Sequence, residues 1–126
     1  MTKSILSTSK APAAIGPYSQ GICANGFIFT SGQIPINPTS GKIEVTEIEG
    51  QTRQVMANLQ EVLKAGGSEF SKVVKATIFL SDLGNFGKVN EIYGSFFPKD
   101  PPARSCVQVG KLPKDSLVEI EMVATL

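Results

Sequence analysis

Arg104 is the side chain whose type and position most clearly suggest chemistry. It lies inside the strand-like run 103–109, and the nearest acidic residues, Asp100 and Asp115, lie outside that run. Charged side chains are rare in buried strands unless another group pairs with them. We therefore expect Arg104 either to point into water or to bind an anion that is not part of the chain.

The absence of histidine limits the reactions that this chain can carry out. Without histidine, Ser-His-Asp and Cys-His nucleophile arrangements are excluded, and so is the usual catalytic zinc site. The two cysteines, Cys23 and Cys106, are too few for a Cys-rich structural zinc site, and the sequence has no GxGxxG or Walker-type loop. We expect chemistry that uses Arg, Glu, Tyr, Ser, Asn, Cys, backbone groups and water, with no metal and no cofactor.

The composition is that of a globular protein without a strong electrostatic field. Its 126 residues, 41% of them hydrophobic, predict one domain over residues 1–126. Twelve basic residues against eleven acidic ones argue against nucleic-acid or membrane-surface partners. We identify no signal peptide, no membrane span and no disulfide framework, so the sequence predicts a cytoplasmic protein with free thiols.

Hydrophobic periodicity predicts strands mixed with two helices. The Asn25-Gly26 pair is typical of a hairpin turn, Gly66 and Gly67 are expected to end the first helix, and Asn85 is the expected cap of the second. The expected elements are a hairpin at 21–34, a short strand near Ile43 and Val45, a helix at 47–67, a strand at 72–80, a helix at 85–97, and strands at 103–109 and 117–125.

This order predicts an α+β fold with both helices on one face of a sheet of five or six strands. The other face of the sheet would also carry apolar side chains, since Phe27 and Phe29 share one side of their strand, and Leu117 and Val123 lie opposite the main apolar set of the last strand. Large exposed apolar surfaces usually mark interfaces. We predict an oligomer that packs sheet against sheet, with clefts between subunits. An exposed sheet with scattered apolar residues is the alternative.

The strands at 103–109 and 117–125 are expected to form a hairpin closed by the turn-rich segment between them. A symmetric closure places Arg104 opposite Met122, and Glu119 about 10 Å from Arg104 at the usual rise per strand residue. A small ligand and a water molecule would fit between them. From the residues alone, a solvated arginine and an outward-facing glutamate are the more ordinary interpretations.

Four sequence blocks resemble the Rid family, also known as the YjgF-type proteins. "PARSCVQVGKLPKDSLVEIE" (102–121) is similar to the family signature: Pro-Ala-Arg-small, an apolar residue, a basic-Leu turn, then apolar-Glu-apolar. "AIGPYSQG" (14–21), "FTSGQIP" (29–35) and "VNEIYGSFF" (89–97) resemble its other blocks, in order and at similar spacing. The arginine-containing signature resembles the RidA subgroup. The resemblance implies a chorismate-mutase-like α+β homotrimer, with a mixed sheet, two helices on one face and active sites between subunits.

The resemblance also implies roles for six residues. Arg104 would bind the substrate carboxylate, and Glu119 would handle the hydrolytic water. The other implied contacts are Tyr18, Ser31, Asn90 and Cys106. Apart from the resemblance, Gly32 is expected to let the backbone approach the ligand, because glycine has no side chain. Each also has a purely structural interpretation: a wet hydroxyl at a core edge for Tyr18, turn chemistry for Ser31, a surface amide for Asn90, and a small strand hydrophobe for Cys106. A nucleophilic Cys106 is disfavoured, because no histidine is present to deprotonate it.

The activity implied by the resemblance is hydrolysis of reactive 2-imino acids, such as 2-iminobutanoate and 2-iminopropanoate, to 2-keto acids and ammonium. The partner would be a small 2-imino or 2-keto acid. The main alternative is a non-catalytic trimer that binds 2-keto acids as a metabolite sensor. A nucleic-acid-acting protein is a second alternative, against which the near-neutral charge and missing histidine argue.

Overall fold

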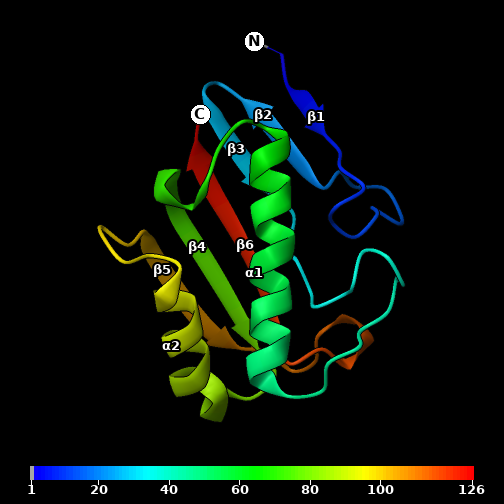
Figure 1. The fold of residues 1–126 in the computed structure, drawn as a ribbon, viewed down its shortest axis with the longest axis vertical. Helices are drawn as coiled ribbons and strands as arrows, with labels where there is room; N and C mark the ends of the chain where they lie inside the picture. The colour runs from blue at the N-terminus through cyan, green and yellow to red at the C-terminus, as the bar shows by residue number, and fades with distance from the viewer. Residues whose placement is uncertain (1) are drawn as a thin grey trace.

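The computed structural model describes residues 2–126, which form one mixed sheet with two helices on the same face (Figure 1). The sheet has six strands in the order β1-β2-β3-β6-β4-β5. The elements are β1 (Ser4–Leu6), β2 (Gly21–Ala24), β3 (Phe27–Thr30), α1 (Ile48–Ala65), β4 (Val73–Leu80), α2 (Phe86–Ser95), β5 (Ala103–Gln108) and β6 (Val118–Thr125), with short 3₁₀ turns η1 (Phe70–Lys72), η2 (Leu83–Asn85) and η3 (Pro113–Asp115). The predicted α+β fold is confirmed.

Among the strands of residues 2–126, only β4 and β5 run parallel, and α2 is the crossover that joins them. The other neighbouring strands are antiparallel. Because the crossover returns the chain beside β4, β5 becomes one edge of the sheet and α2 lies over that edge. This arrangement brings the residues of α2 to the arginine-bearing strand.

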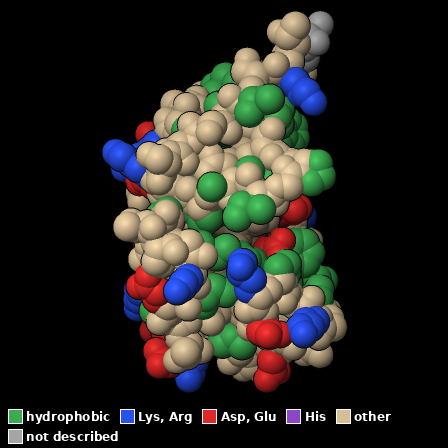
Figure 2. All heavy atoms as spheres, turned by 90° about the vertical axis from the view of Figure 1, so that its right-hand side faces the viewer, with side chains coloured by type: hydrophobic (Ala, Val, Ile, Leu, Met, Phe, Trp, Pro, Cys, Tyr) green, Lys and Arg blue, Asp and Glu red, His purple; other side chains and the backbone are tan. Residues whose placement is uncertain are grey.

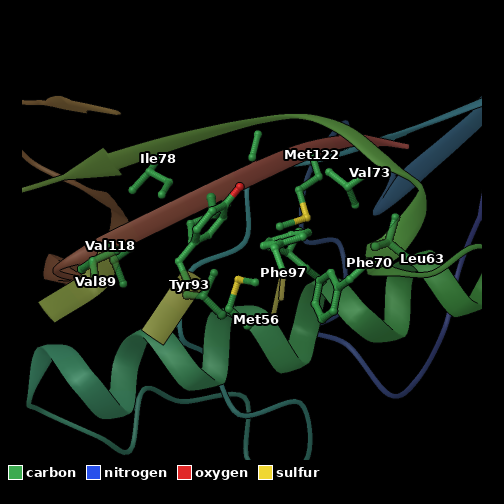
Figure 3. Close-up of a cluster of buried hydrophobic side chains, with 14 of the residues drawn as sticks. Met56, Leu63, Phe70, Val73, Ile78, Val89, Tyr93, Phe97, Val118 and Met122 are labelled. Carbon is green, nitrogen blue, oxygen red and sulfur yellow. The ribbon is translucent and has the colours of Figure 1, made fainter. Parts of the chain in front are cut away.

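The core lies between the sheet and the two helices. The apolar stripe of α1, including Met56, Leu59 and Leu63, packs against the inward side chains of the central strands, including Ile28, Ile78 and Ile120. Figure 3 shows Tyr93 and Phe97 standing between the helices and the strands, with the Tyr93 hydroxyl directed toward the sheet. Tyr93 of α2 and Phe97, which follows the helix, therefore complete the same core.

The predicted hairpin is confirmed, because β2 and β3 pair directly across Asn25 and Gly26. Both turn residues have positive φ, 53° and 80°, as a two-residue hairpin turn requires. The end of α1 also follows the prediction, with Gly67 at φ 80° directly after the C-cap Gly66.

The predicted hairpin between the last two strands is wrong. β4 lies between β5 and β6, so that Ala76 pairs with Arg104 on one side and with Met122 on the other. The expected alignment of Arg104 with Met122 is preserved, but one strand separates them. Neighbouring strands in sequence do not always pair in space, and here β6 completes its hydrogen bonding between β3 and β4.

Two smaller predictions also need correction. Ile43 forms only an isolated bridge with Ile36, so there is no strand near Ile43 and Val45, and β1 supplies the sixth strand instead. Asn85 occupies the N-cap position of α2 but makes no side-chain capping bond. The preceding turn η2 is capped instead by Asp82, whose carboxylate accepts a hydrogen bond from the Gly84 amide.

The face of the sheet opposite the helices, here named the open face, exposes large apolar side chains. Phe27 and Phe29 of β3 and Val107 of β5 each leave more than a third of their surface exposed.

Figure 2 shows another side of the molecule, the right-hand side of Figure 1. There, basic and acidic side chains are mixed, and hydrophobic side chains reach the surface between them. Within residues 2–126, neither helix is long and apolar enough to cross a membrane.

Candidate active site

Arg104 binds to α2 rather than pointing freely into water. Its Nη1 donates a hydrogen bond to Asn90 Oδ1 at 2.7 Å. Its guanidinium carbon also lies over two aromatic rings, 5.4 Å from the centroid of Phe86 and 5.1 Å from that of Tyr93. The helix therefore holds the guanidinium through one amide oxygen and two ring faces.

No carboxylate of the described chain neutralises Arg104. The three ion pairs formed by residues 2–126 all join a lysine to an acid elsewhere on the surface. Arg104 borders a pocket of about 420 Å³, lined by Asn90, Tyr93, Gly94, Phe97, Pro101, Pro102 and Arg104. A cation beside an open pocket, without an acidic partner, is suited to bind an anion.

Cys106 lies on the same face of β5 as Arg104, and its side chain packs against the core. Burial raises the pKa of its thiol, although the neighbouring Arg104 charge opposes that shift. Burial likewise raises the pKa of the Tyr93 hydroxyl to about 12, again opposed by Arg104. Both groups are therefore neutral at physiological pH, and the thiol has little nucleophilic character.

Glu119 is the centre of a second group of predicted residues. It borders a pocket of about 450 Å³ whose lining includes Tyr18, Gly32 and Lys114. A Cβ atom added at Gly32 would collide with the Glu119 carboxylate, so glycine is what permits this close approach. Burial raises the pKa of Glu119, and the like charge of Glu121 raises it further.

Ser31 positions the loop that carries Gly32. Its hydroxyl donates to the Ser19 carbonyl, and its amide donates to the Gln20 carbonyl at 2.9 Å. The buried Gln20 side chain in turn binds backbone groups of the N-terminal segment. These bonds join the loop before β2 to the loop after β3, and they bring Tyr18 and Gly32 to one pocket.

The two groups lie on opposite faces of the sheet. Arg104 shares its row with Ala76 and Met122, whose side chains are buried against the helices. Glu119 instead pairs with Phe79. Side chains alternate between the two faces along a strand, and Phe79 is three positions from Ala76, so Phe79 and Glu119 point to the open face. The two pockets have no lining residue in common. The expectation that one ligand fits between Arg104 and Glu119 is therefore wrong within a single chain.

Sequence reasoning missed the two aromatic residues beside Arg104. The apolar periodicity of residues 85–97 predicts Phe86 and Tyr93 only as members of the buried face of the helix, but both rings contact the guanidinium. Their spacing from Asn90, four residues before and three after, is the sequence feature that could have identified them, because these positions lie on one helix face.

Within residues 2–126, no three Cys, Asp or Glu side chains are close enough together to hold a metal ion.

Comparisons with known proteins agree with this architecture. Residues 8–126 match the family model described as Endoribonuclease L-PSP. Reactive Intermediate Deaminase A of Arabidopsis thaliana, a chloroplast protein, is 52% identical over 124 residues, which cover 98% of this chain and 66% of the plant protein. The 2-iminobutanoate/2-iminopropanoate deaminase of Rattus norvegicus is 47% identical over 122 residues, covering 97% of this chain and 89% of the rat protein.

Among solved structures, a protein of unknown function of the conserved Rid family from Yersinia pestis is similar, with a TM-score of 0.97 and 50% identity. The match covers 99% of this chain and 100% of the Yersinia chain. The chain therefore belongs to the endoribonuclease L-PSP family, the YjgF-type or Rid proteins.

Proposed function

We propose that this protein is a cofactor-free deaminase that hydrolyses small 2-imino acids to 2-keto acids and ammonia. The observation that carries the proposal is the unneutralised Arg104 guanidinium, held by α2 at the edge of a pocket. A planar guanidinium can offer two parallel donors to a carboxylate, which a lysine cannot. The names of the Arabidopsis and rat relatives support the same reaction.

In the proposed mechanism, Arg104 binds the substrate carboxylate and Glu119 orients a water molecule beside the imine carbon. The water oxygen bonds to that carbon while Glu119 takes a water proton and passes it to the nitrogen. The resulting carbinolamine loses its C–N bond, its hydroxyl proton leaves with the nitrogen as ammonia, and a 2-keto acid remains. The raised pKa of Glu119 makes its carboxylate a stronger base for this transfer.

We further propose that the site is completed between copies of the chain in a homotrimer. Support comes from the placement of Arg104 and Glu119 on opposite faces of one sheet, and from the apolar side chains of the open face. One copy would supply Arg104, Asn90 and Cys106, and its neighbour would supply Tyr18, Ser31, Gly32 and Glu119. We also propose a cytoplasmic location, which the unpaired thiols of Cys23 and Cys106 support.

A coupled assay tests the reaction. A pyridoxal-phosphate-dependent threonine dehydratase releases the enamine tautomer of 2-iminobutanoate, and 2-ketobutanoate is then measured with and without this protein. We expect the protein to accelerate 2-ketobutanoate release and Arg104→Ala to abolish that acceleration. Arg104→Lys keeps the charge but loses the bidentate geometry, so it should restore little activity. A fully active Arg104→Ala variant would contradict the proposal.

Mixing variants tests the shared site. Arg104→Ala and Glu119→Gln chains are each expected to be inactive alone. Co-expressed, they would form assemblies in which about a quarter of the sites pair an intact Arg104 with an intact Glu119 from a neighbour. Recovered activity in the mixed assembly supports a site between subunits. Its complete absence, with mixed assemblies demonstrated by two different affinity tags, would show that each chain works alone.

The same Glu119→Gln variant separates the enzyme from a carboxylate-binding sensor. An enzyme should lose turnover and still bind 2-ketobutanoate, whereas a sensor should keep its only property, binding. The family description also mentions an endoribonuclease. The balanced charge and absence of histidine argue against that activity here, and tight, salt-sensitive RNA binding would be the result that favours it.

A further inference from the structure

We infer that Phe86 and Tyr93 are positioning residues, which orient the Arg104 guanidinium for a carboxylate ligand without neutralising its charge. The inference rests on the proposed function, because that proposal assigns the carboxylate to Arg104. It adds two residues of α2 whose rings act on the ligand through Arg104, and of the two, Tyr93 also lines the pocket. With Asn90 they form one unit, here named the α2 clamp.

The spacing of its three residues places the α2 clamp on one face of the helix. Phe86, Asn90 and Tyr93 follow one another at intervals of four and three residues, so they lie along one face of α2. All three side chains of that face contact Arg104 of β5, the strand to which α2 itself leads. Because α2 leads directly into β5, the short connection between them is enough to place all three side chains beside Arg104.

The chemistry of the clamp preserves the positive charge. An acidic partner would orient the guanidinium equally well, but it would occupy the donors and compete with an incoming carboxylate. Ring faces attract a cation through their quadrupole and accept no strong hydrogen bond. A guanidinium has five N–H donors, and the structure uses one of them, on Asn90. The remaining donors are available to a ligand.

The two rings differ in how firmly they are held. Tyr93 is 3% exposed, belongs to the core cluster and packs on Phe97 with ring centroids 4.8 Å apart. Its hydroxyl is buried and has no hydrogen-bond partner. The ring of Tyr93, rather than its hydroxyl, therefore makes the contact with Arg104. Phe86 is 37% exposed and closes the clamp at the surface. Substitution of Phe86 can therefore loosen Arg104 while leaving the core intact.

The decisive measurement is the affinity for 2-ketobutanoate, determined by calorimetry on the assembled protein. We expect Phe86→Leu to raise the Kd about threefold to tenfold, the range that one lost cation–π contact implies. Phe86→Tyr restores the ring and should bind like the wild type, and so should Tyr93→Phe, which keeps the ring and removes only the unpartnered hydroxyl. In turnover, Phe86→Leu should raise KM more than it lowers kcat.

Phe96→Leu is the matched control. Phe96 is a half-buried phenylalanine directly after α2, but its ring packs on Phe70, with centroids 5.4 Å apart, rather than on Arg104. We expect its Kd to match the wild type. A second readout needs no ligand: the guanidinium N–H signals of Arg104 in ¹⁵N NMR should be resolved in the wild type and averaged by faster rotation in Phe86→Leu.

The possible results separate the two proposals. If the wild type binds and turns over but Phe86→Leu has an unchanged Kd and unchanged Arg104 signals, the positioning role is overturned and the proposed function stands. If Phe96→Leu weakens binding as much as Phe86→Leu, the effect is a general loss of packing and the inference also fails. If the wild type neither binds 2-ketobutanoate nor accelerates hydrolysis, the proposed function fails and the inference fails with it.

Discussion

The two charged residues at the centre of the proposed chemistry both lack an oppositely charged partner. Arg104 forms no ion pair in the described chain, and Glu119 is half-buried beside the like charge of Glu121. A desolvated charge without an opposite charge is expensive to maintain. Such residues are therefore best explained by what they bind rather than by what they hold together.

At the residue scale, we predict that Glu119→Gln is slightly more stable than the wild type at neutral pH. Burial raises the pKa of Glu119 in the folded state, so the folded state favours the protonated carboxyl. The wild type therefore loses stability as the pH rises through that pKa. The gain from Gln should stay below about 1 kcal/mol, because solvent screens a half-exposed charge. Urea unfolding from pH 4 to pH 8 measures it.

The sign of this pH dependence is the critical point. The stability difference between Glu119→Gln and the wild type should vanish at pH values below the pKa of the unfolded carboxyl, where both chains are neutral at this position. Glu121→Gln is the useful comparison, because it removes one of the two causes of the shift and should lower the pKa of Glu119. A Glu119→Gln variant that is less stable at pH 8 than at pH 4, relative to wild type, would contradict the assignment.

At the scale of elements, glycine has opposite effects in a turn and in a helix. Gly26 sits in the hairpin turn at φ 80°, and an added Cβ would meet no atom within 4 Å. Gly26→Ala should therefore lose about 1 kcal/mol through backbone conformation alone. Gly87 in α2 has equally open space, so Gly87→Ala should gain about 0.5 kcal/mol or more. Chemical denaturation of both variants tests the pair, and changes of the same sign would refute it.

The helices and the β2–β3 hairpin could be predicted from the sequence because their signals are local. The apolar repeat of α1 and the Asn25-Gly26 turn each depend on a few neighbouring residues. Strand order is not local. The segment before β6 has the length and turn residues of a hairpin loop, yet β6 pairs with β3 and β4. β1 was missed because three residues give too short a pattern.

At the scale of the whole molecule, the open face is where we expect copies of the chain to meet. Phe29 is 46% exposed on that face, and a carboxylate placed there would be buried without a partner, which costs several kcal/mol. Phe29→Glu should therefore dissociate the assembly and remove most deaminase activity. Light scattering coupled to gel filtration measures the mass, and the coupled assay measures turnover.

Leu83→Glu is the matched control for that variant. Leu83 is also 46% exposed, but it lies on η2 at the entrance to α2, away from the open face. We expect this variant to keep the mass and activity of the wild type. An assembled, active Phe29→Glu protein would show that copies do not meet through this face, and the proposed shared site would lose its main structural support.

The site could be predicted from sequence only as a set of residues. The resemblance supplied Arg104 and Glu119, and the structure brings Asn90 to the first and Gly32 to the second. The division between two faces escaped sequence reasoning, because it depends on β4 lying between β5 and β6. The clamp rings also escaped it, since an apolar stripe does not reveal which of its members contacts a charge.

The central place of β6 has a consequence for how the protein is made. The ribosome delivers β1 to β5 before β6, yet β6 fills the position between β3 and β4. Until that strand emerges, β3 and the β4–β5 pair have no common partner, and both leave unsatisfied backbone edges that favour aggregation. The nascent chain therefore cannot close its sheet until β6 has left the ribosome, and β6 is the strand that joins the two parts of the sheet.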